Sequence, residues 1–466
     1  MQKTERPGTY FGTDGFRGEA GIAPSSMQAY RIGRFLGWHY AGKKREPGER
    51  ARIVIGKDTR RSSYMLEYSI AAGIAASGAD AYMLHVIPTP GVAYVASREG
   101  FDCGVMITAS HNPYSDNGIK LIDSHGEKLG EEVTAGVEAY LDGDLGALGL
   151  SGELPYAVGD RVGCIRDHAA GRNRYIGYLI SLAAHSYRHL RIGLDCANGA
   201  SFGIAPAVFR ALGAELFVIG DTPDGLNINE GCGSTKPDRL RSLVLTHRLD
   251  VGFAFDGDAD RCLAIDAHGR LVSGDEILYI LARREAARGS LGGNAIVGTV
   301  MTNSALPEAL AEIGIGLERT AVGDRFVYER MLDRGLTVGG ESSGHIILRK
   351  YATTGDGLLT AMMLAEEMTE TKRPLAALVS PLKLYPERTE SLRVRDREAV
   401  LRDGRVSAVL DAVRAELDGA GRVILRASGT EPCVRVTVEC RDAEACRTYI
   451  GRITDAIRKG GHTDDT

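Results

Sequence analysis

Short runs of apolar residues, rich in valine and isoleucine, alternate along the chain with segments whose apolar positions recur at helical spacing. The first elements predicted in this way are a strand and turn at residues 52–60, a helix at 64–77, a strand at 79–91 and a strand at 102–110. Alternation of strands and helices is expected of α/β layers with parallel strands. Ser110 is then predicted at or just past the end of a strand.

The same alternation restarts twice and then changes character. The second group comprises strands at 190–195, 214–220 and 251–255 with a helix at 204–212, and the third comprises a strand at 295–300 and a helix at 304–313. The tail instead shows helices at 400–417 and 443–459 around strands at 422–427 and 434–439. We therefore predict three related α/β domains with mixed sheets and a C-terminal α+β domain.

Shifts in composition at residues 145–162 and 372–385 predict linkers between these domains. With these linkers, the predicted domains are residues 1–162, 163–266, 267–380 and 381–466.

Composition narrows the possible classes of protein. A net charge of -5 over 466 residues argues against a nucleic-acid-binding protein, which would show a basic stripe. No apolar run is long enough to span a bilayer, and no export signal or CxxC pair is present. We therefore expect neither nucleic acid nor membrane as a partner, and a cytoplasmic location.

The most specific stretch is DGDADR, which directly follows an apolar strand. Asp256, Asp258 and Asp260 occupy alternate positions, and alternate side chains of an extended segment face the same way. Three carboxylates on one side repel one another unless a cation neutralises them. An EF-hand calcium loop is excluded because Arg261 and Ala267 stand at its sixth and twelfth positions. A solvated acidic turn is the alternative to the favoured interpretation, a catalytic Mg²⁺ site.

Three other stretches combine glycines with polar residues. RASGTEPCVR flanks small hydroxyl residues with Arg426 and Arg435, which predicts a phosphate-binding loop, although SGT alone is also a common turn. GGESSGH, at residues 339–345, predicts a tight loop suited to sugar hydroxyls, with a plain β-turn as the alternative. FGTDGFRG contains Arg17, which either points at a phosphate or belongs to a simple turn.

The stretch ITASHNPYSDNGIKL places a serine beside a histidine but lacks the glycines of a nucleophile elbow. In an extended loop, His111 is expected to point away from Ser110, which argues against a hydrolase pair. Ligands bind at the carboxyl ends of strands in α/β sheets, where Ser110 is predicted to lie. Lys120 could act as a general base if nearby cations lowered its pKa, and an ordinary surface lysine is the alternative.

TASHNP, DGDADR, GGESSGH and RASGTEP occur together in an order that resembles the α-D-phosphohexomutase superfamily, over nearly the whole chain. YFGTDGFRGEAG, LNINEGCGST, AVGDRFVYERM and TTGDGLLTAMM resemble its bacterial phosphoglucosamine mutase subgroup in particular. Ser342 and Ala259 depart from the residues common there, but only at spacer positions. The resemblance implies four domains around a central cleft, with one motif of each domain facing it.

The resemblance also implies roles for individual residues. The implied catalytic residues are Ser110, which carries a phosphoryl group, and Lys120, Arg261 and His345. The implied ligands of one Mg²⁺ per subunit are Asp256, Asp258, Asp260 and a phosphate oxygen on Ser110. The implied substrate-binding residues are Arg17, His111, Glu341, Ser343, Arg426, Ser428, Gly429, Thr430 and Arg435.

The implied reaction converts glucosamine 6-phosphate to glucosamine 1-phosphate through the phosphoserine and a glucosamine 1,6-bisphosphate intermediate. It would feed the synthesis of UDP-N-acetylglucosamine and cell-wall precursors. The alternatives are a phosphoglucomutase or phosphomannomutase, a metal-dependent sugar phosphatase, and a non-enzymatic sugar-phosphate sensor. The expected partner is a small sugar phosphate, and some relatives suggest a homodimer formed through the first domain.

Overall fold

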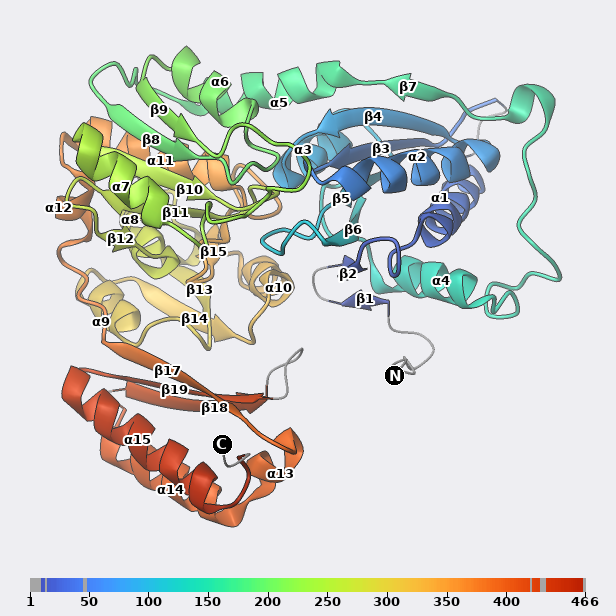
Figure 1. Ribbon diagram of the computed structural model, residues 1–466. Coiled ribbons are helices and arrows are strands. Elements are labelled where there is room, and N and C mark those ends of the chain that lie inside the picture. Colours follow the sequence, from blue (N-terminus) through green and yellow to red (C-terminus); the bar gives the residue numbers. More distant parts are fainter. Residues whose placement is uncertain (1–9, 13–14, 45–47, 420, 428–432, 464–466) are drawn as a thin grey trace. The chain divides into compact units, whose positions relative to one another are not determined.

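The computed structural model describes residues 10–12, 15–44, 48–419, 421–427 and 433–463 (Figure 1). The chain divides into two compact units, which are described separately: Met1–Met301 with Leu317–Val379, and Thr302–Gly316 with Ser380–Thr466. Within the described part, no helix has the length and apolar character needed to cross a bilayer.

The first sheet contains seven strands in the order β1–β2–β6–β5–β3–β4–β7. Their bounds are β1 Phe11–Gly12, β2 Gly15–Glu19, β3 Arg52–Lys57, β4 Asp80–Val86, β5 Cys103–Ile107, β6 Asp116–Asp123 and β7 Ile165–Asp167. β3, β4, β5 and β7 run parallel, whereas β6 runs antiparallel to both β5 and β2. The chain therefore leaves β5 through the loop 108–115 and returns along β6, which brings Lys120 opposite Met106.

Helices cover both faces of this sheet. Cys103, Val105 and Ile107 face the core that the sheet forms with α1 (Ser26–Ala41), α2 (Arg61–Ala76) and α4 (Glu131–Asp142). Gly104, between them, faces Val92 of α3 (Thr89–Arg98) on the other side of the sheet. This alternation along one buried strand gives the three-layer arrangement expected of an α/β domain.

The second and third sheets are also mixed. The second has the order β12–β11–β10–β8–β9, and the third has the order β14–β13–β15–β16. Their bounds are β8 Arg191–Asp195, β9 Glu215–Ile219, β10 Val251–Phe255, β11 Cys262–Asp266, β12 Leu271–Val272, β13 Ala295–Thr299, β14 Gly316–Thr320, β15 Val338–Gly340 and β16 Ile346–Leu348. β10 runs parallel to β8 and antiparallel to β11, so the loop 256–261 reverses the chain at the carboxyl end of β10.

The remaining helices of the first unit pack on the three sheets or on one another. They are α5 Ala169–Leu182, α6 Ile204–Ala211, α7 Asp238–His247, α8 Gly274–Ala287, α10 Asp324–Arg334, α11 Gly357–Thr371 and α12 Leu375–Val379, with short 3-10 helices at Gly159–Arg161 and Gly292–Asn294. α7 contacts β8 and β10, whereas α8 contacts both β11 and β15 and so joins the two sheets.

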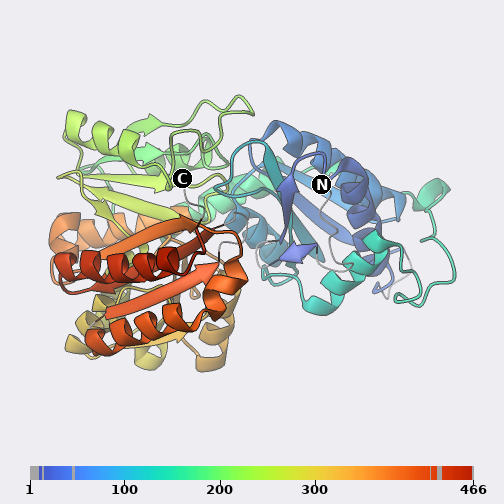
Figure 2. The same cartoon turned by 60° about the horizontal axis from the view of Figure 1, so that its bottom comes forward.

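The second unit contains a three-stranded antiparallel sheet in the order β17–β19–β18. Its elements are α9 Ala305–Glu312, β17 Glu387–Arg393, α13 Arg397–Arg402, α14 Gly404–Leu417, β18 Gly421–Ala427, β19 Cys433–Cys440 and α15 Ala443–Lys459. α14 and α15 pack side by side against this sheet around one apolar core (Figure 2).

Local sequence explains several boundaries. Ser25 caps α1 in a reciprocal capping box with Gln28, and Asp442 caps α15 by accepting from two backbone N–H groups.

The predicted strand at 251–255 and the predicted helix at 443–459 are confirmed without any shift. The prediction of three α/β domains and a different C-terminal domain is likewise confirmed.

Other sequence predictions need correction. The strand predicted at 79–91 ends at Val86, and α3 begins at Thr89, because Pro90 fits a first helical turn that needs no N–H from it. The helix predicted at 400–417 is divided by Asp403, whose carboxylate caps α14. The predicted linkers stay predictions: Leu145, Leu148 and Leu150 of the first one pack onto the first core, and the second one contains α12 and the boundary between the two compact units after Val379.

Candidate active site

Ser110 lies just past the carboxyl end of β5 and is completely buried. Its backbone adopts a left-handed conformation with φ of 51°, which costs a residue other than glycine about 1–3 kcal/mol. The backbone N–H of Ser110 donates to Thr108 Oγ1 at 2.9 Å. The loop therefore holds the serine in a conformation that an isolated peptide would rarely adopt.

This conformation directs the hydroxyl of Ser110 toward the acidic loop after β10. Ser110 Oγ donates to Asp256 Oδ2 at 2.5 Å, across 146 positions of sequence. His111 Nδ1 lies 3.4 Å from the same Oγ. The expectation that His111 points away from Ser110 is therefore wrong, because neighbouring side chains alternate only in extended backbone.

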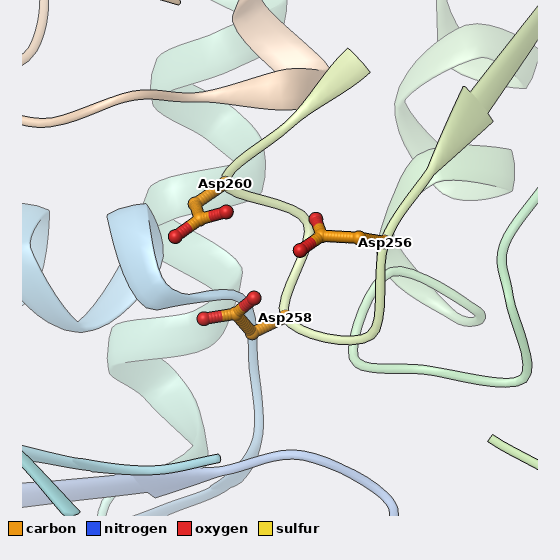
Figure 3. Close-up of side chains that lie close together, drawn as sticks. All are labelled: Asp256, Asp258 and Asp260. Atoms are coloured by element: carbon orange, nitrogen blue, oxygen red, sulfur yellow. The ribbon is translucent and has the colours of Figure 1, made fainter. Parts of the chain in front are cut away.

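Asp256, Asp258 and Asp260 converge on one point from a single turn (Figure 3). One ligand oxygen from each carboxylate lies within 4.8 Å of the others, and all three side chains are buried. Ala259 has a φ of 53°, so the segment is a tight turn and not the extended stretch assumed from the sequence. The turn nonetheless brings the three carboxylates together.

The three carboxyl groups differ in their affinity for protons. Burial, followed by the charges of Asp260 and Asp258, raises the pKa of Asp256 well above its usual range. Burial also raises the pKa of Asp258, but the ammonium of Lys120 and the hydroxyl of Thr89 outweigh it, and the net shift is downward. Burial is again outweighed at Asp260, where Lys120 and His345 hold the pKa well below its usual range.

The cluster has the properties expected of a divalent-cation site. Among the described residues, neither Asp258 Oδ1 nor Asp260 Oδ1 has a hydrogen-bond partner, although both oxygens are buried. Buried carboxylate oxygens without partners are costly, and a hard cation such as Mg²⁺ prefers oxygen ligands. The three aspartates therefore fit a metal ion.

Lys120 joins the first domain to this cluster. Its Nζ donates to Asp258 Oδ2 at 2.7 Å and to Asp260 Oδ2 at 3.0 Å. Thr89 Oγ1 donates to the same oxygen of Asp258 at 2.5 Å. A role as a general base would require cations near Lys120, whereas these two partners are carboxylates, which favour the ammonium.

A small cavity of about 150 Å³ opens beside the cluster. It is lined by Arg17, Asp260, Arg261, Val322, Gly323, Asp324, Glu341 and His345. His345 is buried with Nδ1 3.8 Å from Asp260 Oδ1, and its Nε2 accepts the N–H of Gly355 at 3.1 Å. Burial lowers the pKa of His345, but the nearby carboxylates of Asp260 and Asp324 outweigh it and raise the pKa.

The predicted sugar loop borders this cavity. Glu341 Oε1 accepts the N–H of Gly323 at 3.0 Å, which leaves the other carboxylate oxygen for a ligand. Ser343 Oγ is buried without a hydrogen-bond partner among the described residues. The backbone of the loop docks onto the strand after DGDADR through the bond from Cys262 N to Gly344 O, at 3.0 Å.

The predicted phosphate-binding residues belong to the second unit. Arg426 on β18 stands directly opposite Arg435 on β19 in the antiparallel register. Like charges opposite one another destabilise a sheet, so this pair fits an anion held between the guanidinium groups. Ser428, Gly429 and Thr430 lie outside the described residues.

Comparison with known proteins gives four matches in chain order. Models of phosphoglucomutase/phosphomannomutase alpha/beta/alpha domains I, II and III match residues 8–145, 173–269 and 273–385, and the model of the C-terminal domain matches residues 391–456. A phosphoglucosamine mutase from Lachnospira eligens is 53% identical over 98% of this chain and 99% of that protein. The chain belongs to the phosphoglucomutase/phosphomannomutase family.

A second relative also supports this assignment, and two solved structures show the same fold. A phosphoglucosamine mutase from Lachnoclostridium phytofermentans is 49% identical over 98% of this chain and 99% of its own length. A family member from Burkholderia thailandensis has the same fold, with a TM-score of 0.77 at 23% identity and 97% coverage of both chains. An Aspergillus fumigatus N-acetylphosphoglucosamine mutase, solved with GlcNAc-6P and magnesium, gives a TM-score of 0.63 at 19% identity, covering 97% of this chain and 96% of its own.

The structure also brings residues into the site that sequence reasoning missed. Thr89, Asn229 and Asp324 were not assigned a role, and neither was Arg60, which lies beside the Ser110 loop. Asn229 lies in the stretch LNINEGCGST and Asp324 in the stretch AVGDRFVYERM. Both stretches contribute to the family resemblance, but the resemblance does not indicate what these two residues contact. The residues DTR, at 58–60, directly follow β3 at the same sheet edge as Ser110, and this position is the signal that could have found Arg60.

Proposed function

We propose that this protein is a phosphoglucosamine mutase that converts glucosamine 6-phosphate to glucosamine 1-phosphate. The observation that carries the proposal is the contact of 2.5 Å between Ser110 Oγ and Asp256, within a buried cluster of three carboxylates. Phosphoryl transfer from a hydroxyl needs positive charge beside the phosphoryl group, and a divalent cation held by these carboxylates would supply it. The identity to phosphoglucosamine mutases supports the choice of substrate.

In this proposal Ser110 carries the phosphoryl group that is exchanged. The bond between Ser110 Oγ and phosphorus breaks while the 1-hydroxyl of the sugar forms a new bond to phosphorus and loses its proton. The resulting glucosamine 1,6-bisphosphate turns over, and Ser110 Oγ then takes the phosphoryl group from position 6. In the first step the proton of the 1-hydroxyl ends on Ser110 Oγ, and in the second step the proton of Ser110 Oγ ends on the oxygen at position 6, so no net phosphate is released.

Asp256, Asp258 and Asp260, with a phosphoryl oxygen on Ser110, would hold one Mg²⁺. When bound, the ion withdraws negative charge from the phosphoryl group during transfer. Arg261 and Lys120 flank the cluster and add positive charge beside it. His345, whose Nδ1 faces Asp260, would fix the orientation of that carboxylate or move a proton at the substrate hydroxyl.

The other residues would hold the substrate. Glu341 and Ser343 offer a carboxylate oxygen and a buried hydroxyl, which suit the hydroxyl groups of a sugar. Arg17 lines the same cavity, and His111 lies against Ser110, so both are proposed to contact the transferred phosphoryl group. Arg426 and Arg435, with Ser428, Gly429 and Thr430, are proposed to hold the phosphate that is not reacting.

Turnover of three sugar phosphates tests the proposal. The purified protein with Mg²⁺ and a trace of bisphosphate is offered glucosamine, glucose and mannose 6-phosphates, and the 1-phosphates are measured by phosphorus NMR. We expect the highest kcat/KM with glucosamine 6-phosphate, and an intact mass that contains one added phosphoryl group. A higher kcat/KM with glucose or mannose phosphate would favour a phosphoglucomutase or phosphomannomutase. Steady release of inorganic phosphate would favour a phosphatase, and binding without turnover would favour a sensor.

Three further expectations stay predictions. They are the domain boundaries at residues 162, 266 and 380, a homodimer formed through the first domain, and a cytoplasmic location. Light scattering at several protein concentrations would test the homodimer.

A further inference from the structure

Arg60 is completely buried, and its guanidinium group binds the loop that carries Ser110. Arg60 Nη2 donates to the backbone carbonyls of Ser110 and Asn112, each at 2.9 Å. Arg60 Nη1 donates to the carbonyl of Asp116 at 3.1 Å and also to that of Pro113. One side chain thus holds three carbonyl groups of the loop and a fourth at the start of β6.

The orientation of Arg60 is itself fixed. Arg60 Nε donates to Asp58 Oδ2 at 2.8 Å, and the backbone N–H of Arg60 donates to Asp58 Oδ1 at 3.0 Å. The hydroxyl of Ser63 donates to the same Asp58 Oδ1 at 2.9 Å. Because the buried charge is paired and hydrogen-bonded, the planar guanidinium has little freedom to turn.

Asn229 holds the same loop from the second domain. Its Nδ2 donates to the carbonyl of Ser110 at 2.8 Å and to that of Asn112 at 3.0 Å. The carbonyl of Ser110 therefore accepts hydrogen bonds from Arg60 and Asn229, which belong to two different domains. Gly257, between the first two aspartates, packs so closely that an added Cβ would lie 2.5 Å from this carbonyl oxygen.

We propose that Arg60 and Asn229 are positioning residues that hold the Ser110 loop in its left-handed conformation and so keep Oγ against Asp256. Neither residue is assigned contact with the substrate, and each acts through the backbone of the loop. The catalytic part of this inference rests on the proposed function. Displacing a reacting atom by about 1 Å can lower a rate about 10²-fold, so loss of the hydrogen bonds that hold the loop should lower kcat.

Arg60→Lys is the main test, with Arg34→Lys as its matched control. Arg34 is 1% exposed and Arg60 is 0% exposed, and Arg34 likewise donates to backbone carbonyls, those of Ala76, Leu154 and Pro155. Lysine keeps the charge but has no planar fork to reach several carbonyls at once. Both variants should lose thermal stability, but only the change at Arg60 should alter the Ser110 loop.

For Arg60→Lys we expect kcat to fall about 10–100-fold with KM changed less than about threefold, whereas Arg34→Lys keeps both. We also expect faster amide hydrogen exchange at residues 108–116 in Arg60→Lys alone. Added guanidinium should restore part of the turnover of Arg60→Ala and none of any turnover lost in Arg34→Ala.

Asn229→Ala provides a second variant should the changes at Arg60 prevent folding. Its control is Asn227→Ala, because Asn227 Nδ2 donates to the carbonyl of Thr222 within its own loop. We expect a fall in kcat and faster exchange at residues 108–116 for Asn229→Ala only.

Equal kcat and equal exchange of the Ser110 loop in the Arg60 and Arg34 variants, and in the Asn229 and Asn227 variants, would overturn the inference. The exchange measurement needs no substrate. If the wild type turned over no sugar phosphate, the proposed function would fail, while the exchange of residues 108–116 would still decide whether Arg60 and Asn229 hold the loop.

Discussion

Each of the two units contains a group of neighbouring like charges. Asp256, Asp258 and Asp260 are buried within 4.8 Å of one another and are already bound by hydroxyl groups and an ammonium. Arg426 and Arg435 face each other across β18 and β19, where Arg426 is exposed and Arg435 half-buried.

The difference follows from the cost of burial. A buried carboxylate without compensation is strongly unfavourable, so the fold itself must supply partners from the first domain. Guanidinium groups that are at least partly exposed are screened by water and salt, and they can exchange one anion for another. The acid cluster is therefore a preorganised site, and the arginine pair is suited to binding and releasing a phosphate during each turnover.

The largest effect is expected at Ser110, which contacts the acid cluster and carries the transferred phosphoryl group in this proposal. Ser110→Ala should lower turnover by at least about 10³-fold, because no other group carries the phosphoryl in this proposal. The fold should stay intact, as circular dichroism and the thermal midpoint will show. A near-normal rate in a protein without bound phosphoryl would contradict the role of Ser110.

A second prediction concerns Asp356, a buried carboxylate outside the acid cluster. Asp356 caps α11 and accepts a hydrogen bond from the hydroxyl of Tyr175 at 2.9 Å, and burial raises its pKa to about 6 from 3.8. The folded protein therefore binds an extra proton in this range, and stability falls as pH rises from about 4 to about 6.

Asp356→Asn should remove this pH dependence while keeping the cap through its amide oxygen. The difference in unfolding free energy between wild type and variant should change by about 3 kcal/mol across that range, measured by urea unfolding at several pH values. A constant difference would show that Asp356 titrates normally. The result would show how burial shifts the pKa of Asp356, in contrast to Asp258 and Asp260, whose pKa values nearby cations lower.

A third prediction tests the acid cluster as a metal site. Mg²⁺ should stabilise the wild type by about 2.7 kcal/mol at a concentration one hundred times Kd, which raises the thermal midpoint. Asp258→Asn should abolish this increment, and Arg435→Ala should retain it. If Mg²⁺ raised the midpoint of Asp258→Asn as much as that of the wild type, the ion would bind elsewhere.

The smallest effect is expected at the arginine pair. Arg435→Ala should raise KM roughly tenfold with a smaller change in kcat, since a charge-assisted hydrogen bond contributes about 1.5–3 kcal/mol. Arg452→Ala is the control, because Arg452 pairs with Glu416 on the exposed surface of the same unit. A loss of kcat at unchanged KM would place Arg435 in the chemical step and weaken the contrast with the acid cluster.

The sequence by itself determined the local elements and the residue types of the site. Apolar periodicity located β10 and α15, and the spacing of Asp256, Asp258 and Asp260 predicted a cluster of carboxylates, which the fold does assemble. These features depend on residues that are close together in the sequence. The repeat of a helix or a strand determines the directions of their side chains.

Only the tertiary structure decided how distant segments meet. The left-handed φ of Ser110 turned His111 toward it, against the prediction from extended backbone. The antiparallel return of β6 brought Lys120 between two carboxylates, which set its charge environment. Arg60 and Asn229 donate hydrogen bonds to the Ser110 carbonyl, although they lie 50 and 119 residues away in the sequence. Such contacts depend on strand order and domain packing, which no local pattern in the chain specifies.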